Sequence, residues 1–89
     1  DRGLEESLYW RAMAHNALKY ANSRAQHASA KGADDPAAAA KLAEIAKIDE
    51  ETLAAQKTGR AARFQERTLE RKRRAAESEF EALRQQAAK

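Results

Sequence analysis

The chain has 89 residues, the length of one domain or of a fragment of one, and carries a formal net charge of +3. It contains no cysteine, which excludes a disulfide framework and a zinc site built from thiolates. Valine is absent, which disfavours strands. Alanine occupies 23 positions and only 15 residues are larger apolar ones, so the hydrophobic core of an isolated chain would be only marginally stable. We therefore expect a helical protein that forms a homo-oligomer or attaches to a larger protein assembly.

The first predicted helix covers about residues 4–30. Apolar residues recur at helical spacing on one broad face, and the opposite face is polar. We expect the apolar face to pack against the next helix, with Trp10, Ala21, Leu42 and Leu53 buried between the two helices. The apolar face holds Tyr9, Trp10, Met13, Ala14, Ala17, Leu18, Tyr20, Ala21, Ala25 and Ala28. The polar face holds Arg11, His15, Lys19, Asn22, Ser23 and Gln26.

A turn is predicted at residues 31–35, between the first helix and the second. Gly32 suits the left-handed conformation that ends many helices. Asp35 suits the N-cap position, and Pro36 suits the first position inside a helix. These three residues form the strongest local signal in the sequence.

Two further helices are predicted, over about 36–57 and 60–87. In one straight helix over 36–88, their apolar stripes would lie on nearly opposite sides, with the reversal at Thr58-Gly59. Either the chain breaks at residues 58–59, or each half meets a different partner. The fold class is thus all-α: an antiparallel helical hairpin or a three-helix bundle with coiled-coil character, in one domain over 1–89. The first stripe is Ala39, Leu42, Ile45, Ala46 and Leu53, and the second is Ala62, Leu69, Ala76, Phe80, Leu83 and Ala87.

A row of arginines follows the third predicted helix at three- and four-residue steps, across from Leu69 and Phe80. It is either a solvated face, or a contact site for an acidic protein, or a contact site for nucleic acid. On a solvated face, Glu70 would pair locally with Arg67 and Arg74, and Glu77 with Arg73. No aromatic residue interleaves the row as a platform for base stacking, so an acidic protein is favoured over nucleic acid. The row consists of Arg60, Arg63, Arg67, Arg71 and Arg74.

The remaining candidate residues do not form a catalytic or ligand-binding set. Tyr9 and Trp10 are either anchors for a protein partner or the bulky end of the core. His15 and His27 lie on different faces with no acid at a useful spacing, so we expect two surface histidines. No glycine-rich phosphate loop occurs, and no serine has a catalytic partner set. We expect no enzymatic activity, no cofactor and no metal site.

The segment from the turn into the second helix resembles the minor pilin family of conjugative type IV secretion systems. In that family an Asp-Pro pair opens a long helix, and a leucine follows seven residues after the Asp. The chain departs from the family pattern at Ala46, where isoleucine is usual. The matching residues are Asp35-Pro36, Leu42, Asp49 in place of a usual glutamate, Leu53, Gln56, and upstream Ala17-Leu18-Lys19-Tyr20-Ala21.

The resemblance implies a periplasmic or extracellular three-helix bundle without catalysis, located at the tip of the conjugative pilus. Such proteins contribute to pilus assembly and to contact with the recipient cell. The alternative is a cytoplasmic basic helical protein that binds nucleic acid or an acidic protein surface through the arginine row. No apolar run approaches the roughly 20 residues that cross a bilayer, and no signal peptide opens the sequence. The chain begins with Asp1 rather than Met, which leaves room for a processed upstream segment.

Overall fold

The computed structural model describes the backbone of residues 2–58 and 62–89, and the side chains of residues 11–57 and 64–89. Helix α1 spans Arg2–Ala28, α2 spans Pro36–Thr58 and α3 spans Ala62–Ala88. No strand occurs in these ranges, and the prediction of an all-α fold is confirmed. The first helix ends two residues earlier than predicted.

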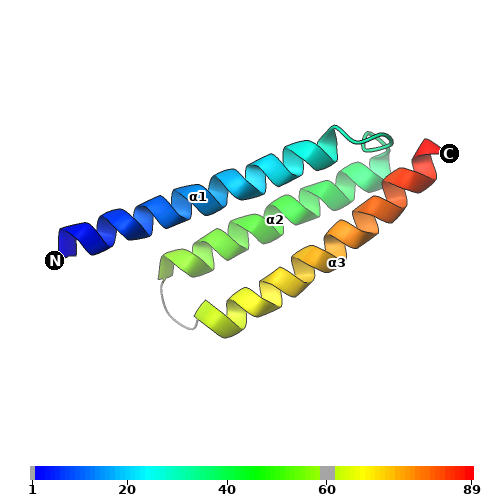
Figure 1. Ribbon diagram of the computed structural model, residues 1–89. Helices are drawn as coiled ribbons and strands as arrows, with labels where there is room; N and C mark the ends of the chain where they lie inside the picture. Colours follow the sequence, from blue (N-terminus) through cyan, green and yellow to red (C-terminus); the bar gives the residue numbers. More distant parts are fainter. Residues whose placement is uncertain (1, 59–61) are drawn as a thin grey trace.

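The three helices lie side by side, with α2 between α1 and α3 (Figure 1). Helices α1 and α3 run in the same direction, and α2 runs antiparallel to both (Figure 1). Residues 36–88 therefore form two antiparallel helices and not one. Of the two residues at the predicted break, Thr58 ends α2 and Gly59 lies outside the described residues. The Cα trace measures 56 × 23 × 13 Å. Helices with a Cα radius of about 2.3 Å and axes about 9 Å apart would make a triangle only ~14 Å wide. The second dimension of the trace, 23 Å, exceeds the width of such a triangle, which indicates that the three helices form an open layer.

The predicted capping residues begin α2. The Asp35 carboxylate accepts hydrogen bonds from the Ala37 and Ala38 backbone N–H groups, at 3.1 and 3.2 Å. Pro36 occupies the first helical position, where its missing N–H costs nothing. Asp35 is thus the N-cap that the sequence predicts.

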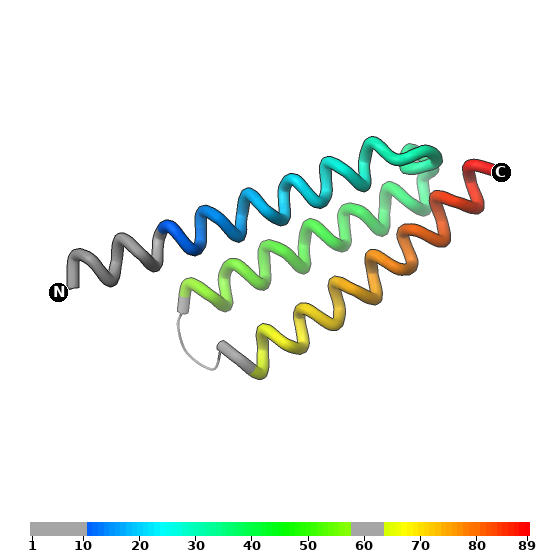
Figure 2. The backbone as a smooth tube through the Cα atoms, in the orientation of Figure 1, coloured from blue at the N-terminus to red at the C-terminus, as the bar shows by residue number. Residues whose placement is uncertain are grey.

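Gly32 fixes the loop between α1 and α2 against the end of α3. Its φ angle is +85°, a conformation that side chains disfavour. A Cβ atom at this position would lie 2.0 Å from the Arg84 carbonyl oxygen and 3.2 Å from the Ala88 nitrogen. Figure 2 shows this loop beside the C-terminal end of the chain. The loop is therefore a packed element that requires glycine for two separate reasons.

An alanine in the left-handed conformation costs ~1–2 kcal/mol relative to its preferred conformations. We predict that Gly32→Ala lowers the free energy of unfolding by more than this cost, because the backbone of α3 must also move. Urea unfolding followed by circular dichroism measures this change. Lys31→Ala is the matched control, since its exposed side chain leaves and its backbone stays. Equal stability of the two variants would contradict this packing.

The hydrophobic core lies between α2 and α3. Predicted stripe residues Leu69, Ala76 and Phe80 are buried, and Leu83 packs against them. Leu42 also packs against the core but is only half-buried, and Leu53 is half-buried. The buried hydrophobic residues are Ala33, Ala38, Ile45, Ile48, Ala55, Leu69, Ala76 and Phe80.

The predicted orientation of α1 is wrong. Ala21 is exposed, and Leu18 is 61% exposed. The side of α1 that faces the other helices is mostly polar, although it includes half-buried Met13 and Tyr20. The helix therefore turns much of its apolar face outward, and the next subsection shows which contacts hold its polar side inward. The exposed stripe consists of Ala14, Ala17, Leu18, Ala21, Ala25 and Ala28. The side chain of Trp10 lies outside the described residues.

We predict that Ile45→Ala, at a fully buried position, lowers the free energy of unfolding by about 2–5 kcal/mol. Leu18→Ala should change it by less than about 0.5 kcal/mol, because most of that side chain is already in water. Denaturant titration of both variants tests the assignment of inner and outer faces. A large loss for Leu18→Ala would mean that a partner or a second copy covers α1.

Candidate functional site

A buried carboxylate links all three helices. Asp49 on α2 is 1% exposed. Its Oδ2 atom accepts a hydrogen bond from Arg24 on α1 at 2.7 Å, and its Oδ1 atom accepts one from Arg73 on α3 at 2.6 Å. A second Arg73 nitrogen lies 3.3 Å from Oδ2, so the Arg73–Asp49 pair is bidentate. Asp49 therefore joins the two outer helices through one side chain.

Arg73 is enclosed by groups from all three helices. It also donates to Glu77 at 2.8 Å, and its Cζ atom lies 5.1 Å from the centre of the Tyr20 ring. Burial by itself would lower the pKa of Arg73, but hydrogen bonds and charge from Asp49 and Glu77 raise it above its ordinary value. The guanidinium is thus a fixed positive charge between α1 and α3, and the Tyr20 ring stacks on it.

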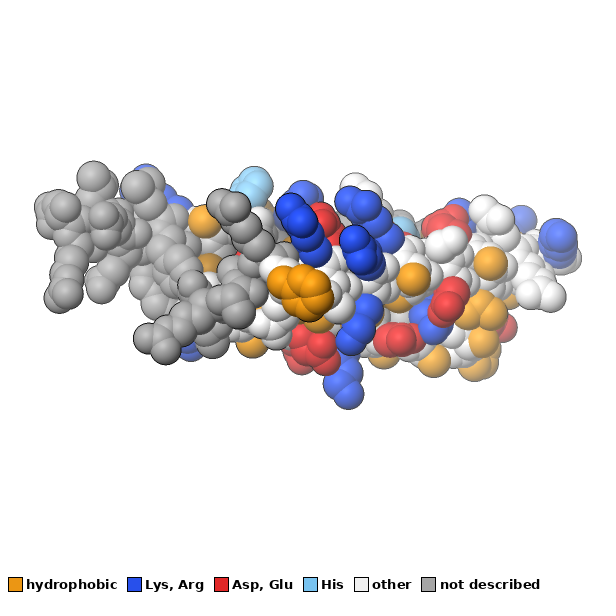
Figure 3. All heavy atoms as spheres, turned by 90° about the horizontal axis from the view of Figure 1, so that it is seen from below, with side chains coloured by type: hydrophobic (Ala, Val, Ile, Leu, Met, Phe, Trp, Pro, Cys, Tyr) orange, Lys and Arg blue, Asp and Glu red, His pale blue; other side chains and the backbone are white. Residues whose placement is uncertain are grey.

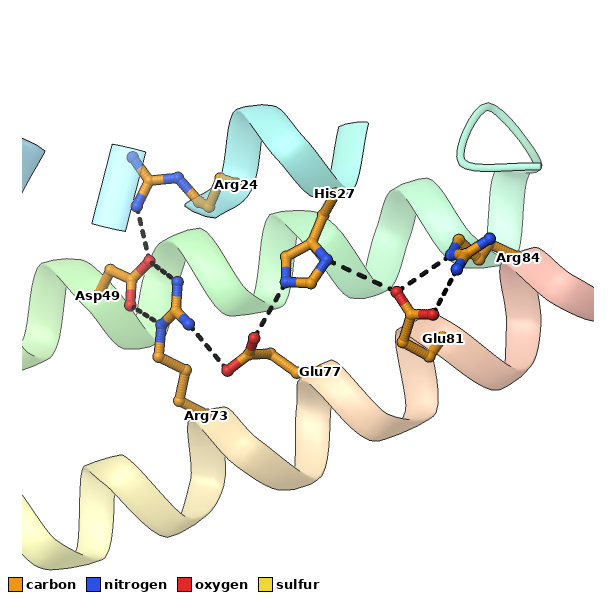
Figure 4. Close-up of polar contacts among 7 residues, drawn as sticks. All are labelled: Arg24, His27, Asp49, Arg73, Glu77, Glu81 and Arg84. Atoms are coloured by element: carbon orange, nitrogen blue, oxygen red, sulfur yellow. Dashed lines mark hydrogen bonds and ion pairs between the residues drawn. The ribbon is translucent and has the colours of Figure 1, made fainter. Parts of the chain in front are cut away.

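His27 continues this network toward the C-terminal end of α3 (Figure 4). Its Nε2 atom lies 3.0 Å from Glu77, its Nδ1 atom lies 3.7 Å from Glu81, and its ring meets the Phe80 ring edge-on at 5.2 Å. The prediction of a surface histidine without a nearby acid is therefore wrong for His27. The acids come from another helix, so no spacing within α1 reveals them. His15 is exposed, as predicted.

The network ends at the loop between α1 and α2. Arg84 donates to both carboxylate oxygens of Glu81, at 3.0 and 2.5 Å, and reaches the Lys31 carbonyl oxygen at 3.4 Å. These hydrogen bonds from Arg84 lower the pKa of Glu81. The polar network thus alternates basic and acidic side chains. Their order along the network is Arg24, Asp49, Arg73, Glu77, His27, Glu81 and Arg84. Among the described residues, no buried side-chain nitrogen or oxygen lacks a hydrogen-bond partner.

Burial first, and then the negative charge of Asp49, raise the pKa of Tyr20. A raised phenol pKa favours the neutral form in the folded protein. The resulting stability is present below about pH 10 and is lost as the pH rises through the folded-state pKa. We predict that Asp49→Asn shifts the Tyr20 titration to lower pH, measured as tyrosinate absorbance in a Tyr9→Phe background.

Glu44→Gln is the control for this titration, because it removes a carboxylate elsewhere on α2. Circular dichroism should confirm that each variant keeps its helices. An unchanged or raised Tyr20 midpoint in the Asp49→Asn variant would contradict the assigned charge effect.

A groove of about 280 Å³ opens between α1 and α3 over this network. Tyr20 lines it from α1, Thr52 from α2, and Leu69 and Arg73 from α3. Thr52 donates its hydroxyl hydrogen to the Ile48 carbonyl oxygen at 2.9 Å, so this hydroxyl is already engaged. The groove holds as many acidic as basic side chains, which gives it no preference for ligand charge. Its basic side chains are Lys19, Arg73 and Arg74, and its acidic ones are Glu66, Glu70 and Glu77.

The described part of the arginine row lies on the surface, as predicted. Arg67, Arg71 and Arg74 are exposed. Arg74 has a 3.7 Å contact with Glu70, whereas Arg67 and Arg71 have no ion-pair partner among the described residues. The expected Arg67–Glu70 pair is absent there. The side chains of Arg60, Arg63, Tyr9 and Trp10 lie outside the described residues.

An exposed aromatic residue accompanies the arginine row. Phe64 is 83% exposed and precedes Arg67 by three residues and Arg71 by seven, which places all three on one helical face. The prediction that no aromatic residue interleaves the arginine row is therefore wrong, because Phe64 lies within the row. Figure 3 shows Lys and Arg side chains on the face seen from below Figure 1, interspersed with Asp and Glu side chains. We call Phe64, Arg67 and Arg71 the α3 outer surface.

Arg73 and Asp49 were not predicted as site residues, but their spacing in the sequence contains a partial signal for their burial. Arg73 lies four residues after Leu69 and three before Ala76, which is a position within the buried stripe of α3. Asp49 follows Ile48 and precedes Thr52, both buried residues of α2. A charged residue in a buried stripe needs an opposite charge from another helix, and Arg73 and Asp49 meet that need together.

The described residues contain no group of three His, Cys, Asp or Glu side chains that could hold a metal ion. None of the described helices combines the length and apolar character needed to span a membrane. Comparisons with models of protein families, with curated proteins and with solved structures found no match for this chain. The resemblance to minor pilins therefore stays a prediction.

Proposed function

We propose that this protein is a non-enzymatic interaction module that binds an acidic protein partner through the α3 outer surface. The observation that carries the proposal is a pair of exposed arginines, Arg67 and Arg71, that have no ion-pair partner in the described part of the chain and lie beside the exposed ring of Phe64. Arginine and aromatic side chains are enriched at the centres of protein interfaces. Carboxylates of a partner would pair with the two guanidinium groups while an apolar contact covers the ring.

Two features favour a protein partner over nucleic acid. Glu70 lies beside the arginine row and is exposed, so a continuous phosphate backbone would meet a negative charge. Phe64 is the one exposed large aromatic among the described side chains, whereas binding to a single strand uses several stacking rings. Assembly of a pilus or of a secretion system, which the pilin resemblance implies, would proceed through the same kind of protein contact.

We predict that Arg67→Glu with Arg71→Glu weakens binding of an acidic peptide by about tenfold or more, in a salt-dependent way. The probe is a labelled polyglutamate peptide with a leucine at every fourth position, titrated at low salt and at about 0.3 M salt. Phe64→Ala should weaken binding of this peptide at both salt concentrations. Helicity should stay unchanged, because all three side chains are exposed.

Arg11→Glu with Lys19→Glu is the matched control, since it reverses two exposed charges on α1. Equal losses in the two double variants would show that net charge alone attracts the peptide. Tighter binding to duplex DNA than to the peptide, lost through the same α3 variant, would favour nucleic acid as the partner.

A further inference from the structure

Helix α1 contributes nothing to the hydrophobic core among its described side chains. Every member of the buried cluster comes from α2, from α3 or, in the case of Ala33, from the loop before α2. The side chains of Ile45 and Phe80, both fully buried, lie on α2 and α3. The α2–α3 hairpin and the loop before it therefore supply every apolar side chain of this cluster.

The contacts that hold α1 are mainly polar. Arg24 pairs with Asp49, His27 with Glu77 and Glu81, and Asn16 donates to Gln56 at 3.2 Å. In contrast, Leu18 and the alanines of the outer stripe face water. Hydrophobic burial, which dominates the docking of most helices, is thus weak over residues 11–28, the part of α1 whose side chains the structure describes.

The α1–α3 contact is also loose. No Cα atom of described α1 lies within 8 Å of one in described α3, so only long side chains such as His27 span the gap. The groove of about 280 Å³ occupies part of this gap. Helix α1 therefore meets α3 through long side chains alone, and its close backbone approach is to α2, so its release opens only the α1–α2 contact.

We propose that α1 is a releasable helix that detaches as a unit from a folded α2–α3 hairpin. The ion pairs of Arg24 and His27 hold it in the docked state. The helix leaves when these pairs are lost, which uncovers the carboxylates of Asp49 and Glu77. The local opening of α1 therefore costs less free energy than the unfolding of α2 and α3, and the two processes are separable.

Hydrogen exchange of the full-length chain, resolved by helix, tests this proposal with Arg24→Ala combined with His27→Ala. The expected result is a loss of protection of about tenfold or more in α1, with protection in α2 and α3 nearly unchanged. Lys41→Ala is the matched control. It removes an ion pair between α2 and α3, with Glu79, and leaves every α1 contact intact. This control should not lower protection in α1 selectively.

The wild-type chain provides a second measurement that needs no substitution. About 1 M salt should speed exchange in α1 more than in α2 and α3, because Arg24 and Glu77 are 30% and 29% exposed and their charges can be screened, although buried Asp49 is shielded from the salt. Parallel loss of protection in all three helices, in the variant or in salt, would overturn the proposal, because the three helices would then form one cooperative unit. Unchanged α1 protection in the double variant would also overturn it.

Discussion

The arrangement of the three helices depends on one buried carboxylate. Asp49 is 1% exposed, and an unpaired charge at such a position costs several kcal/mol. Arg24 and Arg73 offset this cost, and they come from opposite sides of α2. Full pairing of Asp49 therefore requires α1 and α3 to flank α2 at the same level. One acidic residue thus sets both the lateral order of the helices and their relative height.

The distribution of charge along the chain makes this pairing obligatory between helices. No acidic residue occurs between Glu6 and Asp34, whereas this segment holds Arg24 and His27. Neither side chain has an acid at pairing distance on α1, so each contacts an acid on α2 or α3. The polar side of α1 therefore faces inward, even though most of its alanines lie on the other side.

Local chemistry explains which parts of the fold the sequence could predict. The turn and the start of α2 follow from Gly32, Asp35 and Pro36, whose preferences operate within a few residues. The inner face of α3 follows from the spacing of its apolar residues. The orientation of α1 could not be predicted in this way, because its apolar face competes with ion pairs that span 25 and 50 residues of sequence. Hydrophobic periodicity ranks the faces of one helix and carries no information on such distant pairs.

The same limit explains why the arginines of α3 divide into two groups that composition cannot distinguish. Arg73 points toward α2, where Asp49 pairs with it, whereas Arg84 pairs with Glu81 of its own helix and reaches the Lys31 carbonyl oxygen of the loop. Arg67 and Arg71 occupy the opposite side of the helix and form no ion pair with a described residue. A difference of a few residues in a helix of 3.6 residues per turn thus separates structural charges from free ones. Only the free charges, next to the exposed ring of Phe64, keep their full electrostatic attraction for an external partner.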